Sequence, residues 1–152
     1  MVDIAMDMLM IEKTKEQIKK HEGYRSEIYL DSVGVPTGGY GHAFHVGSSL
    51  PRQIWEDIFS YDYALHADQA NNLIVQRGYQ DLNHARKAVL IDMVFNLGLA
   101  GVSQFKNTLA LLDKRDFHAV AEGLLNSKWA RQVGSRAEHL AKQMLNGNWT
   151  AF

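Results

Sequence analysis

The sequence contains no cysteine among its 152 residues. This absence excludes a disulfide framework, a zinc site with cysteine ligands and a thiol nucleophile, and it suits synthesis in a reducing cytoplasm. A chain of this length fits one domain and can bury roughly 70% of the surface that its unfolded state exposes. A stable core therefore needs no covalent cross-link.

The chain also lacks a strong net charge. Its formal charge is −1, which predicts no global attraction to nucleic acid or to a membrane surface. Residues 1–62 carry 6 basic and 10 acidic side chains, whereas residues 63–152 carry 10 basic and 7 acidic side chains. Such an asymmetry is common on ordinary protein surfaces. A more specific interpretation is a basic C-terminal part that faces a polyanion such as a bacterial cell wall.

No long apolar run is present either. The apolar residues near the N-terminus are interrupted by Asp3 and Asp7, and no lysine or arginine precedes them. A signal peptide needs a basic start and an uninterrupted apolar stretch, and a membrane helix needs about 20 apolar residues. We therefore expect no signal peptide and no stable membrane insertion, with synthesis in the cytoplasm.

Hydrophobic periodicity predicts helices over most of the chain. Apolar residues at helical spacing mark a first helix, which ends at Gly23, and a second, which Pro51 opens and which runs to about Gln76. Asn83 can cap a third, apolar helix that Gly98 ends. Three shorter helical stretches follow, around Phe105 to Leu112, Asp116 to Leu125 and Ser135 to Leu145.

One segment has a different character. Aromatic and β-branched residues next to glycines and Pro36 indicate a β-hairpin over about residues 28–46, with a third short strand near Phe44 to Val46. The predicted fold class is therefore α+β and mostly helical.

Three residues around this hairpin are suited to acid–base chemistry. Glu22 lies at the predicted C-terminus of the first helix. The partial negative charge there disfavours the ionised carboxylate and so favours the protonated form, which is the form that a general acid needs. Asp31 and Thr37 flank the turn from Ser32 to Pro36, and a hairpin that closes there places them opposite each other, with side chains about 5 Å apart. A carboxylate and a hydroxyl group so placed can hold a water molecule.

Each of the three also has an ordinary structural explanation, as a surface glutamate, a turn-capping aspartate and a strand threonine. Their combination matches glycosidases that invert the anomeric carbon, in which one carboxyl group is the acid and the other orients a water molecule. If the second carboxylate instead acts as a nucleophile, the product keeps its configuration. A metal site is not expected, because His42 and His45 lack a third ligand at metal-site spacing.

The segment from Glu22 to His42 resembles the catalytic motif of phage-type lysozymes, glycoside hydrolase family 24. The aspartate follows the acid by nine residues, and the threonine follows the aspartate by six. The residues that match the motif are Glu22, Gly23, Tyr29, Asp31, Gly34, Thr37, Gly39, Gly41 and His42. Further similarity runs through Ala85 to Gly98, Gly101, Val102, Phe105, Asn107, Ser127 to Trp129, Ser135 to Ala137 and Gly147 to Trp149.

This resemblance implies an endolysin, a muramidase that hydrolyses the β-1,4 bond between N-acetylmuramic acid and N-acetylglucosamine in peptidoglycan for host cell lysis. Glu22 would protonate the glycosidic oxygen, while Asp31 and Thr37 would hold the attacking water. Three residues would bind the substrate: Phe95, Thr108 and Arg136, the last of which would also pair with Glu22. No cofactor is implied.

The resemblance also implies a lysozyme-like two-lobe fold in a single domain over residues 1–152. A small lobe would span about residues 14–62, a connecting helix about 51–76 and a larger helical lobe about 77–152, with the N-terminal helix packing on the helical lobe. The partner would be the glycan strands of peptidoglycan, without nucleic acid, and we expect a monomer. It would reach the cell wall from the host cytoplasm after the membrane is permeabilised.

Two other functions stay open at this point. A lytic transglycosylase uses a single acid and needs no positioned water, so the presence of Asp31 and Thr37 argues against it. A non-catalytic glycan-binding module, or a lysozyme-like domain of a toxin or phage tail, would bind the cell wall without needing the intact trio.

Overall fold

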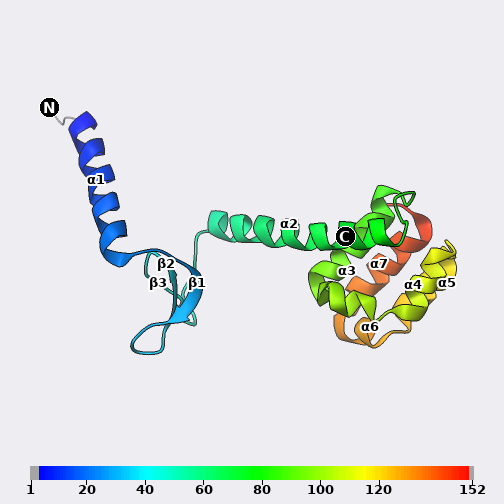
Figure 1. Cartoon of the computed structure of the whole chain (residues 1–152). Helices are drawn as coiled ribbons and strands as arrows, with labels where there is room; N and C mark the ends of the chain where they lie inside the picture. The colour runs from blue at the N-terminus through cyan, green and yellow to red at the C-terminus, as the bar shows by residue number, and fades with distance from the viewer. Residues whose placement is uncertain (1–3, 151–152) are drawn as a thin grey trace. The chain divides into compact units, whose positions relative to one another are not determined.

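The structure is a computed structural model, and it describes residues 4–150. The chain divides into two compact units, Met1–Pro51 and Arg52–Phe152. The first unit combines one helix with a small sheet, and the second is built from helices (Figure 1). The predicted class, α+β and mostly helical, is confirmed.

The first unit contains the helix α1 and a three-stranded antiparallel sheet in the order β1, β2, β3. The bounds are α1 (Ile4–Glu22), β1 (Arg25–Leu30), β2 (Pro36–Gly39) and β3 (His42–Ala43). Gly23 has φ +71°, and its N–H donates to the carbonyl oxygen of Lys19 at 2.9 Å. It therefore ends α1 in the left-handed conformation that the sequence predicted.

The β region was predicted in the right place but with the wrong strand ends. The first strand begins at Arg25 rather than Ile28, and the third lies at His42–Ala43 rather than near Phe44 to Val46. Gly39 and Gly41 have φ +60° and +80°, which glycine adopts without steric cost. The chain consequently reverses direction directly after β2, so the third strand starts earlier than its apolar residues suggest.

The second unit contains six helices within its described residues: α2 (Arg52–Gln76), α3 (His84–Ser103), α4 (Lys106–Asp113), α5 (Phe117–Leu125), α6 (Lys128–Val133) and α7 (Ser135–Asn146). Helix α2 packs on α3, and α7 packs on α3, α5 and α6. Asn83 caps α3 as predicted, because its side chain accepts a hydrogen bond from the N–H of Arg86. Helix α6 was not predicted.

Gly98 was predicted to end α3, and this is only partly right. Its φ of 71° and ψ of 164° break the helix, but helical structure resumes and continues to Ser103. A glycine that interrupts a helix thus gives the same sequence signal as one that ends it.

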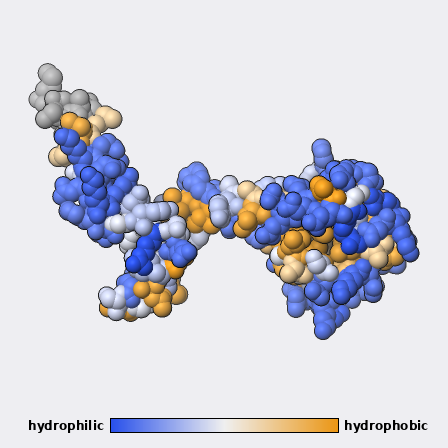
Figure 2. Space-filling view, in the orientation of Figure 1, coloured by the Kyte–Doolittle hydropathy of each residue, from blue (hydrophilic) through white to orange (hydrophobic). Residues whose placement is uncertain are grey.

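The hydrophobic core lies in the second unit. Its buried hydrophobic side chains are found from Ala67 to Met144. Among residues 8–51, the part of the first unit whose side chains are described, no hydrophobic side chain is buried, and Thr37 and Gly38 are the buried residues. The first half of α2 also keeps apolar side chains on its surface, where Figure 2 shows hydrophobic patches.

Within residues 4–150, no single helix is long and apolar enough to cross a membrane. Helices α3 and α4 meet the length and composition criteria only when they are taken together, across a bend of 100°.

Candidate active site

Glu22 is the last residue of α1, and its side chain is exposed. The backbone of the turn between β2 and β3 approaches its carboxyl group at Gly41. A Cβ atom at position 41 would lie 3.0 Å from Oε2 of Glu22, and Gly41 also has φ +80°. Close contact and positive φ together explain why glycine occupies this position. The turn thereby limits where the Glu22 carboxyl group can move.

Asp31 follows β1 and organises the turn that leads to β2. Its Oδ1 atom accepts the N–H of Val33 at 2.9 Å and the N–H of Val35 at 2.8 Å. Its own N–H donates to the carbonyl oxygen of Val35 at 3.0 Å. One carboxylate oxygen therefore holds the turn, and within the described part of the chain Oδ2 accepts no hydrogen bond. That second oxygen is available to a water molecule.

Thr37 lies in β2, and its side chain is 5% exposed. Its hydroxyl group donates to the carbonyl oxygen of Val35 at 3.0 Å. The proton of this hydroxyl is thus already used within the turn, and its lone pairs are what it can offer to another group. Thr37 can therefore accept a hydrogen bond but has no second proton to donate.

The expectation that Asp31 and Thr37 stand directly opposite each other is wrong. The residue paired with Thr37 is Tyr29, and Leu30 pairs with Pro36. Asp31 then faces Val35, which it contacts through the hydrogen bonds of the turn. In this register Asp31 and Thr37 are diagonal neighbours on one face of the sheet, for which the typical separation is about 7–8 Å. The larger separation leaves more room between the two side chains than direct pairing does.

The second unit holds Phe95, Thr108 and Arg136, the residues expected to bind substrate. Arg136 on α7 donates from Nε to Oδ1 of Asp92 on α3 at 2.7 Å. The ring of Phe95 lies one helical turn along α3 from Asp92, 5.7 Å from the ring of Phe59. The structure thus brings Phe95 and Arg136 onto neighbouring helices. The pairing of Arg136 with Glu22 stays a prediction.

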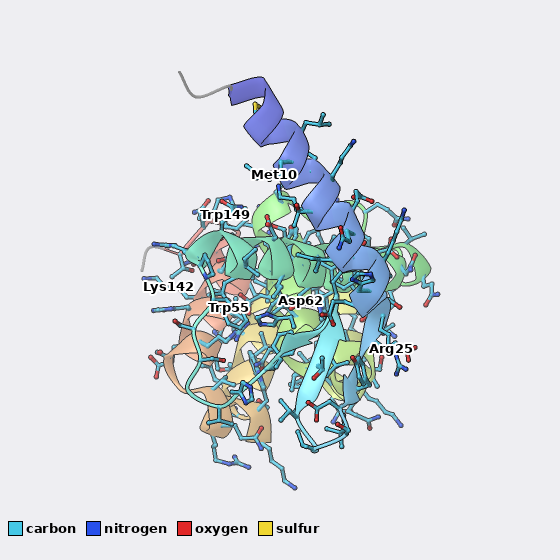
Figure 3. All side chains as sticks on the ribbon, turned by 90° about the vertical axis from the view of Figure 1, so that its left-hand side faces the viewer. Met10, Arg25, Trp55, Asp62, Lys142 and Trp149 are labelled. Carbon is cyan, nitrogen blue, oxygen red and sulfur yellow. The ribbon has the colours of Figure 1, made fainter. Side chains whose placement is uncertain are left out.

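Phe95 and Arg136 both line a pocket of about 340 Å³ within the second unit. Its lining residues are Phe59, Tyr63, Ala88, Ile91, Asp92, Phe95, Arg136 and Trp149. Trp149, which is labelled in Figure 3, is 70% exposed. Aromatic rings beside one ion pair form a surface that can contact both the apolar and the hydroxyl-bearing faces of a ligand.

Asp92 was not predicted as a member of this site. The signal for it was present in the sequence, because an aspartate in the middle of a strongly apolar helix needs a partner when it is partly buried. The partner could not be identified, since Arg136 is 44 residues away in the chain.

Thr108 lies in α4 and faces α5. A Cβ atom at position 123 would lie 2.8 Å from its Oγ1 atom, so Gly123 allows the two helices to approach closely. Thr108 is not among the residues that line the pocket with Phe95 and Arg136. In the described residues, no three His, Cys, Asp or Glu side chains gather into a group that could hold a metal ion.

Comparisons with known proteins point to one family. Residues 19–144 match the family model described as "Phage lysozyme". The chain is 25% identical over 169 residues to "Probable T4-type lysozyme 1" of Dictyostelium discoideum, an alignment that covers 94% of this chain and 99% of that protein. This relative therefore has about the same extent as the chain.

Two phage proteins match over only part of their length. The chain is 24% identical over 162 residues to "Pre-baseplate central spike protein Gp5" of Enterobacteria phage T4, covering 90% of this chain and 28% of that protein. It is 30% identical over 135 residues to "Peptidoglycan hydrolase gp36" of Pseudomonas phage phiKMV, covering 86% of this chain and 15% of that protein. The chain thus spans less than a third of either phage protein.

Proposed function

Because the chain belongs to the phage lysozyme family, we propose that it is a glycoside hydrolase that cuts the glycan strands of bacterial peptidoglycan. The bond is the β-1,4 linkage between N-acetylmuramic acid and N-acetylglucosamine. The observation that carries the proposal is that one unit holds both a helix-end glutamate and a turn whose aspartate and threonine each keep an acceptor position free. The family match and the relatives named lysozyme support the same reaction class.

The proposed reaction is a single displacement. Glu22 donates its proton to the glycosidic oxygen as the bond from that oxygen to the anomeric carbon breaks. A water molecule held by Asp31 and Thr37 attacks the anomeric carbon from the opposite face, and Asp31 accepts the proton that this water loses. The net result is the addition of one water molecule across the bond, with inversion at the anomeric carbon.

In the second unit, we assign glycan binding to Phe95, Thr108 and Arg136. An aromatic ring can pack on the apolar face of a sugar, and a guanidinium group can donate to its hydroxyl and acetamido oxygens. The endolysin role would place the working enzyme at the cell wall after the membrane is permeabilised. A relative named "Endolysin", from Salmonella phage P22, supports this proposal at 25% identity over 116 residues.

The test is Glu22→Gln, which keeps the shape of the side chain but cannot donate the proton of a carboxylic acid. We expect the variant to lose the release of reducing ends from purified peptidoglycan and the clearing of permeabilised Gram-negative cells. Glu16→Gln is the matched control, because Glu16 is an exposed glutamate on the same helix. Substantial activity in Glu22→Gln would refute the role of Glu22 as the acid.

Product analysis separates the remaining mechanisms. Nuclear magnetic resonance of a freshly cut glycan oligomer should show the inverted anomer, and a retained anomer would make Asp31 a nucleophile. A lytic transglycosylase would form an anhydromuramic end, and its products would be lighter by one water molecule per cut. A purely binding module would sediment with cell walls without releasing reducing ends.

A further inference from the structure

We propose that the backbone of Val35 positions the attacking water, by fixing the direction of the Asp31 carboxylate and by keeping the Thr37 hydroxyl group an acceptor toward that water. This inference rests on the proposed hydrolytic function and goes further, since it assigns a role to a residue outside the acid, aspartate and threonine trio. The side chain of Val35 has no part in it. Its C=O group acts on Thr37, and its N–H group acts on Asp31 together with the N–H group of Val33.

The N–H group of Val35 acts on Asp31. It donates to Oδ1 at 2.8 Å, and the N–H of Val33 donates to the same atom at 2.9 Å. Two donors on one oxygen set the rotation of the carboxylate, so Oδ2 has a defined direction. A carboxylate that carries no proton only accepts hydrogen bonds, and Oδ2 is therefore a fixed acceptor for a water molecule.

The C=O group of Val35 acts on Thr37. It accepts the hydroxyl proton of Thr37 at 3.0 Å and the N–H of Asp31 at 3.0 Å. The Thr37 side chain is also almost completely buried, at 5% exposed, which limits its rotation. A hydroxyl group whose proton is held in this way presents only its lone pairs to another partner.

Two acceptors have a definite consequence for the water between them. The water must donate one hydrogen to Asp31 Oδ2 and the other to Thr37 Oγ1, so its own lone pairs point away from both side chains. Those lone pairs are what attacks the anomeric carbon. If Thr37 were free to donate, the water could accept from it and would then point a hydrogen at the sugar.

The first test removes the N–H of Val35. Val35→Pro deletes one of the two donors to Asp31 Oδ1 while leaving the carbonyl group in place, and we expect kcat on purified peptidoglycan to fall about tenfold with KM unchanged. Val35→Ala keeps both backbone groups, so its kcat should fall clearly less than that of Val35→Pro. If the proline variant folds poorly, replacement of Val35 by the corresponding α-hydroxy acid removes the same N–H through an ester bond. A wild-type kcat in the proline or ester variant would overturn the proposal.

The second test concerns the carbonyl group. Thr37→Ser keeps a hydroxyl that can donate to Val35, and Thr37→Val keeps the shape but loses the hydroxyl. We expect Thr37→Ser to stay within about tenfold of the wild-type kcat and Thr37→Val to lose more than about 100-fold. Equal losses would mean that packing of the methyl group, and not the bond to Val35, orients Thr37.

A third measurement does not depend on activity. The amide proton of Val35 should exchange slowly with solvent in the wild type and quickly in Asp31→Ala, as followed by amide hydrogen exchange. Rapid exchange in the wild type would overturn the positioning role even if the enzyme is active. Failure of wild-type protein to release reducing ends, with Val35 protected, would instead refute the proposed function alone.

Discussion

Gly41→Ala tests whether the backbone of the turn between β2 and β3 holds the carboxyl group of Glu22 in place. Gly41 has φ +80°, so alanine there would adopt a left-handed conformation at a cost of about 1–2 kcal/mol. The new Cβ atom would also lie 3.0 Å from Oε2 of Glu22, and the carboxyl group would have to shift by a few tenths of an ångström. Because a displacement of about 1 Å near the reacting atoms costs about 100-fold in rate, we expect kcat to fall about tenfold.

Gly47→Ala is the control for backbone strain. Gly47 has φ +88°, and no atom lies within 4 Å of a Cβ placed there. Both variants should lower Tm by a similar amount, about 2–8 °C for a chain of this size. Only Gly41→Ala should lower kcat, as measured by the release of reducing ends from purified peptidoglycan, with Tm followed by circular dichroism. A similar kcat in the two variants, or a loss in Gly47→Ala, would refute the contact with Glu22 as the cause.

Three further predictions concern the second unit. Tyr79→Phe should cost about 1.5 kcal/mol of unfolding free energy at pH 7, because the buried hydroxyl, whose pKa burial raises to about 12, donates to Asp113 at 2.6 Å. Partial burial opposes ionisation of Asp113, but hydrogen bonds from Tyr79 and Arg77 outweigh it and lower the pKa of that carboxyl group from 3.8. The stability that the ionised carboxylate contributes is therefore present above pH 3.8 and is lost as the pH falls through the lowered value. Urea titrations should therefore show a smaller penalty near pH 2 than at pH 7, and equal penalties would contradict this. Gly123→Ala should cost about 1–3 kcal/mol of unfolding free energy, because its Cβ would lie 2.8 Å from Oγ1 of Thr108. Adding Thr108→Ala to this variant should relieve much of that cost in the same titrations. Strictly additive free-energy changes of the two substitutions would exclude the clash. The isolated second unit should melt cooperatively and the isolated first unit should not, because the buried hydrophobic side chains belong to the second unit. An isolated first unit that folds would disprove this prediction.

Several features could be predicted from the sequence because the forces behind them act over a few residues. Gly23 ends α1 and Asn83 caps α3, each through a hydrogen bond to a residue no more than four positions away. The spacing of Glu22, Asp31 and Thr37 is likewise a local property, and the family it indicated is the family that the comparisons found.

Tertiary contacts decided what the sequence alone left open or misplaced. The register of β1 against β2 pairs Arg25 with Gly39 and Tyr29 with Thr37, and this pairing leaves Val35 rather than Thr37 opposite Asp31. The partner of Arg136 is Asp92, 44 positions earlier, and this pair forms only because α7 packs on α3. Caps and spacings are set by neighbours along the chain, whereas strand register and ion pairs are set by groups that only folding brings together, and no local pattern encodes them.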